Sequence, residues 1–118
     1  MCIRDRLKAS LGASGSLFRY GGEELIAVVT DTDREALATL AERLRLAVEE
    51  LRVEVVAGRA LPLTVSMGAA LFDPAESISC QVVIDYADAS LYHAKQNGRN
   101  CVVAWPFARA LAPRTSQF

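Results

Sequence analysis

The stretch Arg19-Tyr20-Gly21-Gly22-Glu23-Glu24-Leu25 decides the fold of this chain. Before its glycines, residues 16–20 carry aromatic and aliphatic side chains that favour an extended backbone. After its acids, residues 25–29 form a continuous apolar run. Two strand-like runs joined through Gly-Gly are typical of a β-hairpin. Because the second run is apolar on both of its faces, we expect a central strand that is covered on both sides.

Two amphipathic helices are predicted after the hairpin. Thr32 and Glu35 have the spacing of a capping box, which predicts a helix start there. A second helix is predicted from about residue 80 to residue 97, and Gly98 suits the left-handed position that ends it. The apolar stripes of the two helices comprise Leu37, Leu40, Leu44, Ala47 and Leu51, and Ile84, Ala87, Leu91 and Ala94. The polar side of the first helix comprises Arg34, Glu42, Arg43, Arg45, Glu49 and Glu50.

Three further strands complete the predicted order β-β-α-β-β-α-β. They lie at residues 52–57, 63–72 (interrupted at Gly68) and 101–105, and residues 58–62 read as a turn between the first two. This order predicts an α/β fold of the α+β sandwich type, with a mostly antiparallel sheet on which the helices pack.

The composition is that of one globular domain. The chain has 118 residues, 52% of them hydrophobic, which suffices for one domain core. Its 13 basic and 14 acidic side chains leave a net charge of -1, so no strong field draws it to nucleic acid or to a membrane surface. The three cysteines are scattered, and no apolar run reaches the length of a membrane span, so we expect a cytoplasmic protein with reduced thiols. We divide the chain into a lead segment at 1–15, a domain at 16–106 and a C-terminal tail at 107–118.

Two neighbouring carboxylates, Glu23 and Glu24, follow the glycines of the predicted turn. Such a pair can hold Mg²⁺, which prefers oxygen ligands and substrate phosphates, and one of the two can take a proton from a hydroxyl nucleophile. Gly21 and Gly22 would let a bulky ligand approach the backbone closely. The alternative is an ordinary hairpin whose acids are merely solvated.

Two cations, Lys95 and Arg99, lie at the end of the second predicted helix. Both suit phosphate oxygens, and arginine can bind them in bidentate fashion. The alternative is that the cations complement the dipole at the C-terminus of the helix.

Taken together, these features resemble the GGDEF family of diguanylate cyclases. The resemblance covers about residues 16–105, with its motifs in the family's order and spacing. It implies a fold like that of nucleotide cyclases and polymerase palms, and a reaction that condenses two GTP molecules into cyclic di-GMP and pyrophosphate between two facing domains of a homodimer. The motifs are Arg19 to Leu25, Thr64-Val65-Ser66-Met67-Gly68, Ala87-Asp88-Ala89-Ser90-Leu91-Tyr92-His93-Ala94-Lys95, and Gly98-Arg99-Asn100.

The resemblance also implies a role for each matching residue. Glu23 would be the proton acceptor and a ligand of Mg²⁺ or Mn²⁺, and Glu24 would support that metal. Gly21 and Gly22 would pass beneath the nucleotide, whereas Ser66 would serve its strand. The two cations Lys95 and Arg99 would bind the β- and γ-phosphates of GTP.

The chain also departs from the family's pattern. Leu25 replaces the usual phenylalanine, and Gly12 and Gly15 stand where many members carry an inhibitory product site. The family's N-terminal strand and helices, which supply a further metal-binding Asp and the groups that read guanine, have no counterpart before Ser16. We therefore expect an incomplete C-terminal portion of the domain, without cyclase activity by itself. The alternatives are a degenerate module that binds GTP or dimerises as a regulator, and an unrelated α/β domain that binds a small molecule.

Overall fold

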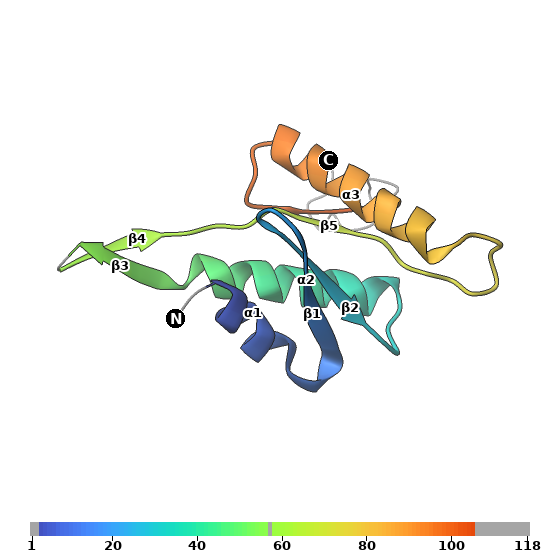
Figure 1. The fold of residues 1–118 in the computed structure, drawn as a ribbon, viewed down its shortest axis with the longest axis horizontal. Helices are drawn as coiled ribbons and strands as arrows, with labels where there is room; N and C mark the ends of the chain where they lie inside the picture. The colour runs from blue at the N-terminus through green and yellow to red at the C-terminus, as the bar shows by residue number, and fades with distance from the viewer. Residues whose placement is uncertain (1–2, 57, 106–118) are drawn as a thin grey trace.

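The computed structural model describes residues 3–56 and 58–105 (Figure 1). Three α-helices, one short 3₁₀ helix and six strands follow one another in this part of the chain. The predicted tail at 107–118 lies outside the described residues, and no helix within them is both long and apolar enough to cross a membrane. In order, the elements are α1 (Ile3–Leu11), η1 (Gly12–Ser14), β1 (Gly15–Gly21), β2 (Glu24–Val29), α2 (Arg34–Glu49), β3 (Arg52–Val56), β4 (Arg59–Pro62), β5 (Met67–Ala69), α3 (Cys80–Gln96) and β6 (Val102–Ala104).

The predicted hairpin is confirmed as the antiparallel pair β1–β2, in which Leu17 lies opposite Ala27. One face of this hairpin packs on the protein core through Leu17, Leu25 and Val29. The expectation of a central, covered β2 is wrong, because β2 pairs with β1 alone in a two-stranded sheet and Val28 is 48% exposed. The run 25–29 is apolar on both faces, yet only one face of the hairpin meets the core.

Helix α2 begins one residue later than the capping-box pattern predicts. Asp33 is the N-cap: its backbone is extended, and its side chain accepts a hydrogen bond of 2.8 Å from the Ala36 N–H. Thr32 instead donates its hydroxyl to the Asp33 carbonyl at 3.3 Å. An aspartate and a threonine are both good caps, and here the aspartate carboxylate satisfies a free amide of the first turn.

The main core lies between α1 and α2, and it confirms part of the predicted stripe. Leu40 and Leu44 are buried against Leu7 and Leu11 of α1. Helix α1 occupies most of the lead segment, and its leucines four residues apart reach the same core. The most deeply buried side chain of α2 is Val48, at 0% exposure, which the predicted stripe did not include.

The region between α2 and α3 differs from the predicted strands. Residues 59–62, predicted as a turn, form β4, which pairs antiparallel with β3. Gly58 takes a left-handed φ of 79°, so the reversal needs few residues and pairing resumes at once. The long strand predicted at 63–72 shrinks to β5, which covers Met67–Ala69 only. In Figure 1 the β3–β4 hairpin extends away from the rest of the molecule.

Strands β5 and β6 pair in parallel, with Gly68 opposite Val103. Helix α3 is the crossover between them, and such a connection is what parallel neighbours require. The mixed helix-and-strand class is therefore confirmed, and strand pairing is mostly antiparallel as predicted, in two ladders of three. The described strands form three two-stranded ladders where one sheet was expected. The strand-helix-strand order of the last third of the sequence already favours a parallel pair.

Helix α3 confirms the second predicted helix almost to the residue. Ser79 caps its start by accepting a hydrogen bond from the Val82 N–H, and Gly98 after its end has the left-handed φ of 102° that was expected. Of the predicted stripe, Ala94 is fully buried, whereas its other members are half-buried. Val83 and Ser90 are the remaining buried positions, so the inward face is rotated slightly from the predicted one.

Gly68 sets the distance between β5 and α3. A Cβ atom built on Gly68 would lie 2.1 Å from the Ala87 carbonyl oxygen and 2.3 Å from the Leu91 backbone nitrogen. Both neighbours are helix backbone and cannot turn aside as a side chain could. No residue other than glycine therefore fits here without moving the helix.

We predict that Gly68→Ala lowers the free energy of unfolding by about 3 kcal/mol, the cost of forcing a methyl group into a filled site. Urea denaturation followed by circular dichroism would measure it. Gly21→Ala is the control, because a Cβ there meets no atom within 4 Å. Equal stability of the Gly68→Ala variant and the wild type would contradict this account of the β5–α3 contact.

Candidate functional site

The predicted acidic turn forms a two-residue reversal between β1 and β2. Gly21 and Glu24 are paired across its base, so Gly22 and Glu23 form the tip. Gly22 has a left-handed φ of 51°, which glycine adopts without strain. The Arg19 guanidinium donates a hydrogen bond of 3.4 Å to the Gly22 carbonyl and so links β1 to the tip of the turn.

The two carboxylates of this turn differ in exposure. Glu23 is exposed at the tip, and Glu24, the first residue of β2, is half-buried. A Cβ built on Gly21 or Gly22 would meet no atom within 4 Å. The glycine backbone is therefore open to close approach by a ligand, as the sequence predicted.

The predicted cations lie at the C-terminal end of α3. Lys95 is half-buried in the last turn of the helix, and Arg99 is exposed just beyond it. The Arg99 N–H donates a hydrogen bond of 3.0 Å to the Ala94 carbonyl, which satisfies one of the free carbonyls at the helix end. Both cations thus belong to one end of one helix.

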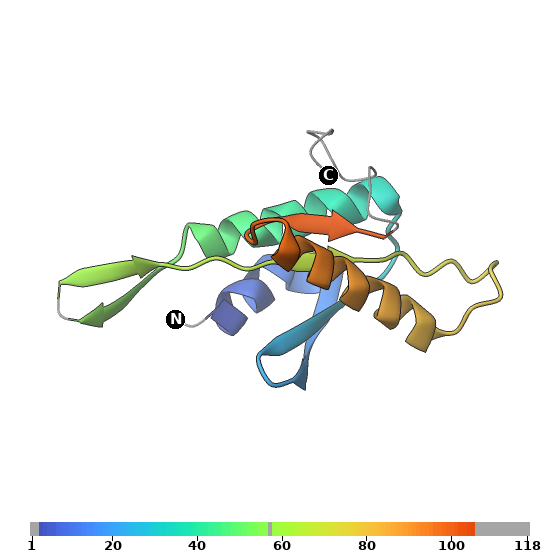
Figure 2. The same cartoon turned by 90° about the horizontal axis from the view of Figure 1, so that it is seen from above.

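Within the described residues, no hydrogen bond or ion pair joins the acidic turn to the cationic helix end. In Figure 1 the tip of the β1–β2 hairpin and the segment after α3 overlap in projection. Seen from above in Figure 2, the hairpin tip stands apart from the end of α3. A single ligand bound by Glu23 and by Lys95 would have to extend across that interval, so the shared site stays a prediction.

Sequence reasoning missed a polar network that joins α2 to the segment after α3. The Asn100 side chain accepts a hydrogen bond of 2.9 Å from Arg45 and donates one of 3.0 Å to Glu49. Arg45 also binds Glu42 through its Nε at 3.0 Å. The Asn100 N–H donates to the Ser66 hydroxyl at 3.1 Å, so Ser66 serves the loop after α3 and not a strand.

The assignment of Arg45 to the wet side of α2 is wrong. Its side chain is only 13% exposed. Arg45 follows Ala41 by four residues and precedes Val48 by three, and both are buried. That spacing places Arg45 on the inward stripe, which is the signal in the sequence that could have found it.

Hydrogen bonding in this network shifts two pKa values. The hydrogen bond to Glu42 raises the pKa of Arg45, against the opposing effect of burial, and the charges of Glu42 and Glu49 raise it further. The hydrogen bond from the Asn100 amide lowers the pKa of Glu49, and Arg45 lowers it further. Each group is thus held in its charged form.

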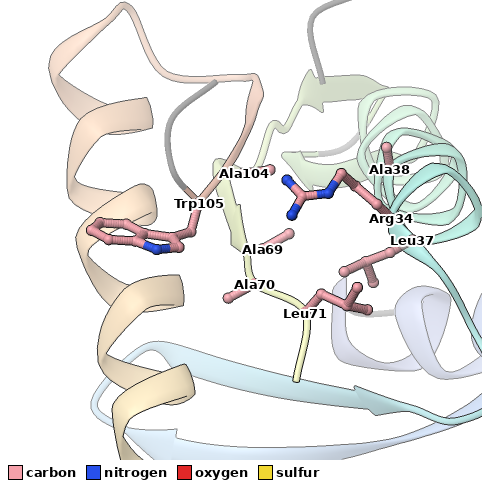
Figure 3. Close-up of a pocket in the computed structure, with 8 residues that line it drawn as sticks. All are labelled: Arg34, Leu37, Ala38, Ala69, Ala70, Leu71, Ala104 and Trp105. Atoms are coloured by element: carbon pink, nitrogen blue, oxygen red, sulfur yellow. The ribbon is translucent and has the colours of Figure 1, made fainter. Parts of the chain in front are cut away.

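A small pocket between α2 and the β5–β6 ladder contains none of the predicted site residues (Figure 3). It is lined mainly by alanine and leucine side chains, and the Arg34 guanidinium reaches toward Ala69 and Ala104. Its volume of about 10 Å³ leaves room for about one water molecule. It is therefore too small to hold a nucleotide.

The two turn carboxylates fit one mode of magnesium binding. Within residues 3–56 and 58–105, no three His, Cys, Asp or Glu side chains gather as a metal site would require. Mg²⁺, however, is commonly held by one or two carboxylates while substrate phosphates and water fill its other positions. Glu23 and Glu24 offer two such carboxylates, so they suit a metal that arrives with a phosphate ligand.

The chain is similar to curated diguanylate cyclases. A family model described as "Diguanylate cyclase, GGDEF domain" matches residues 1–101. Diguanylate cyclase DosC of Escherichia coli is 38% identical over 93 residues, which cover 79% of this chain and 20% of that protein. Response regulator PleD of Caulobacter vibrioides is 34% identical over 99 residues, which cover 83% of this chain and 22% of that protein. The chain spans about a fifth of the length of these relatives.

Solved structures show the same fold. The GGDEF domain of DgcB from Caulobacter crescentus, determined in complex with c-di-GMP, superposes with a TM-score of 0.76 at 30% identity, covering 86% of this chain and 60% of that one. Diguanylate cyclase SiaD of Pseudomonas aeruginosa, determined with its activator SiaC, gives a TM-score of 0.78 at 28% identity, covering 86% of this chain and 38% of that one.

The network predicts a pH dependence of stability. Because the pKa of Glu49 is lower in the folded chain than its ordinary value of 4.5, its hydrogen bonds stabilise the fold above that pH, and this contribution is lost as the pH falls through the folded pKa. We expect Glu49→Gln to be less stable than the wild type at pH 7, and the difference to shrink below about pH 4.5. Urea denaturation at pH 7, 4.5 and 3.5 would measure the difference in the free energy of unfolding between the variant and the wild type.

Glu50→Gln, a substitution at the exposed neighbouring residue, is the control and should show no such convergence. A difference for Glu49→Gln that stays constant with pH would contradict the stabilising role of the Glu49 hydrogen bonds.

Proposed function

Because the chain belongs to the GGDEF family of diguanylate cyclases, we propose that it binds GTP with Mg²⁺ or Mn²⁺ as part of a domain that forms cyclic di-GMP. The observation that carries this proposal is the β1–β2 turn, whose left-handed Gly22 exposes Glu23 at its tip beside an open glycine backbone. The acidic turn lies within the residues that the family model matches, and the structure adds that Glu23 is exposed there.

Each site residue has a proposed part in binding. Gly21 and Gly22 would lie beneath the nucleotide, because no side chain keeps it away. Lys95 and Arg99 would bind the β- and γ-phosphates through charge-assisted hydrogen bonds. Glu23 and Glu24 would hold the metal, which when bound neutralises phosphate charge.

The proposed reaction is attack of a ribose 3′-hydroxyl on the α-phosphate of a second GTP. The new bond joins O3′ to the α-phosphorus, the bond from that phosphorus to the bridging oxygen breaks, and pyrophosphate leaves. The same attack by the 3′-hydroxyl of the other nucleotide closes the ring and releases a second pyrophosphate. Glu23 would accept the proton of the hydroxyl, while Lys95 and Arg99 would neutralise the charge that grows on the pyrophosphate. Since each domain would bring one GTP, the reaction would take place between two such domains.

A second candidate function is GTP binding without turnover, in a regulatory or dimerising module. Two observations favour it for the 118-residue chain. The acidic turn and the end of α3 stand apart (Figure 2), and the described residues gather no third acidic group near Glu23 and Glu24. Binding can use the cations alone, whereas catalysis needs acid, metal and phosphate together.

We predict that the chain binds GTP in the presence of Mg²⁺ and that Lys95→Ala and Arg99→Ala each weaken binding about tenfold, the size expected for one charge-assisted hydrogen bond. Isothermal titration calorimetry would measure the dissociation constants. Lys8→Ala and Arg4→Ala, which remove exposed cations on α1, are the matched controls and should bind as the wild type does. Unchanged affinity in Arg99→Ala would refute the proposed phosphate site.

We further predict that the 118-residue chain with GTP and Mg²⁺ forms no cyclic di-GMP, because the hairpin tip stands apart from the end of α3 (Figure 2). Chromatography of the reaction mixture would detect the product. Product formation that is abolished in Glu23→Gln would contradict this prediction and would identify the chain as a working cyclase.

A further inference from the structure

The backbone beside the candidate phosphate ligand Arg99 is held in an unusual conformation. Arg99 and Asn100 have left-handed φ values of 62° and 49°, directly after Gly98 at 102°. A side chain makes this conformation costly for residues other than glycine, although asparagine tolerates it better than most. Two consecutive residues of this kind persist only where the surrounding structure fixes them.

Three hydrogen bonds of Asn100 hold this left-handed backbone in place. Its side-chain oxygen accepts from Arg45 and its amide donates to Glu49, both on α2. Its backbone N–H donates to Ser66, which lies just before β5. The segment after α3 is therefore tied to two other parts of the fold through one residue.

The anchor on α2 is itself rigid. Arg45 is nearly buried and binds Glu42 and Glu49 at once. Its charge is satisfied within the protein, so it is not available to an exposed ligand. By contrast, Arg99 is exposed, and within residues 3–56 and 58–105 its guanidinium makes no hydrogen bond or ion pair.

We propose that Asn100, anchored by Arg45 and Glu49, is a positioning residue for Arg99: it fixes the left-handed backbone from which the Arg99 guanidinium reaches a phosphate of GTP. This inference rests on the proposed function and adds to it residues on α2 that do not themselves meet the nucleotide. An arginine on a freely moving loop would lose conformational entropy on binding, and a preset backbone removes part of that cost.

The competing interpretation is that the network merely fastens α2 to the end of α3. A double-mutant cycle separates the two, because a residue that acts through Arg99 has no effect on GTP affinity once Arg99 is gone. Asn100→Gly suits the test, since glycine keeps the left-handed backbone accessible while the side-chain bonds to α2 are lost. Asn97→Gly is the matched control: Asn97, the residue after α3, bonds to His93 in the last turn of that helix.

The experiment measures the affinity of the 118-residue chain for GTP with Mg²⁺ by calorimetry. We expect Asn100→Gly to weaken binding about fivefold when Arg99 is present and not at all in the Arg99→Ala background. Asn97→Gly should leave the affinity unchanged in both backgrounds. An equal loss in both backgrounds, or no loss in either, would overturn the inference and leave the proposed function intact.

A second measurement does not depend on nucleotide. In the free protein, hydrogen exchange of the Arg99 amide should be faster in Asn100→Gly than in Asn97→Gly, because the backbone opens more often. Equal exchange rates would overturn the inference even if the affinities changed. If Arg99→Ala binds GTP as tightly as the wild type, the proposed phosphate site fails, and the positioning role fails with it whatever the exchange rates are.

Discussion

The contact between Gly68 and the backbone of α3 is the constraint on which the candidate site depends. Parallel pairing of β5 with β6 requires the chain to cross over between them, and α3 is that crossover. The missing side chain of Gly68 lets the helix approach β5 to within atomic contact of its own backbone. Because the helix lies directly on the ladder, its C-terminal end, with Lys95 and Arg99, has a defined place in the fold. The Gly68 contact at Leu91 lies one helical turn before Lys95, so close packing of the helix on β5 helps to fix where the cations lie.

Local patterns predicted the elements that local interactions determine. The Gly-Gly turn, the course of α3 and the left-handed Gly98 follow from the conformational preferences of a few adjacent residues. Where two good caps stand side by side, as Thr32 and Asp33 do, the pattern does not say which carboxylate or hydroxyl meets the free amide. The predicted ends of the strands differ from the observed ones for a related reason. Tertiary packing determines which strands pair and over which residues.

The site was predictable in its parts but not in its assembly. The residue types of the neighbouring acids Glu23 and Glu24 and of the cation Lys95 indicate their chemistry from the sequence alone, whereas their action on one ligand stays a prediction. The network around Asn100 could not be found that way, since its partners lie 51 and 55 residues away along the chain. The sequence pattern put Arg45 on the polar side of α2 because charged residues usually face water. Charged side chains can nevertheless be buried when they are paired, as Arg45 is.

Arg45 has a different electrostatic role from the two cations at the end of α3. Arg45 is neutralised by two glutamates, so it stabilises the fold and contributes little field outside it. Lys95 and Arg99 have no such partners within the part of the chain that the structure describes. Two uncompensated positive charges at one helix end favour an anion, although the helix dipole there opposes it. Because that dipole amounts to only about half a negative charge, the two cations leave this end of α3 net positive, and an anion is attracted more strongly the more negative charge it carries.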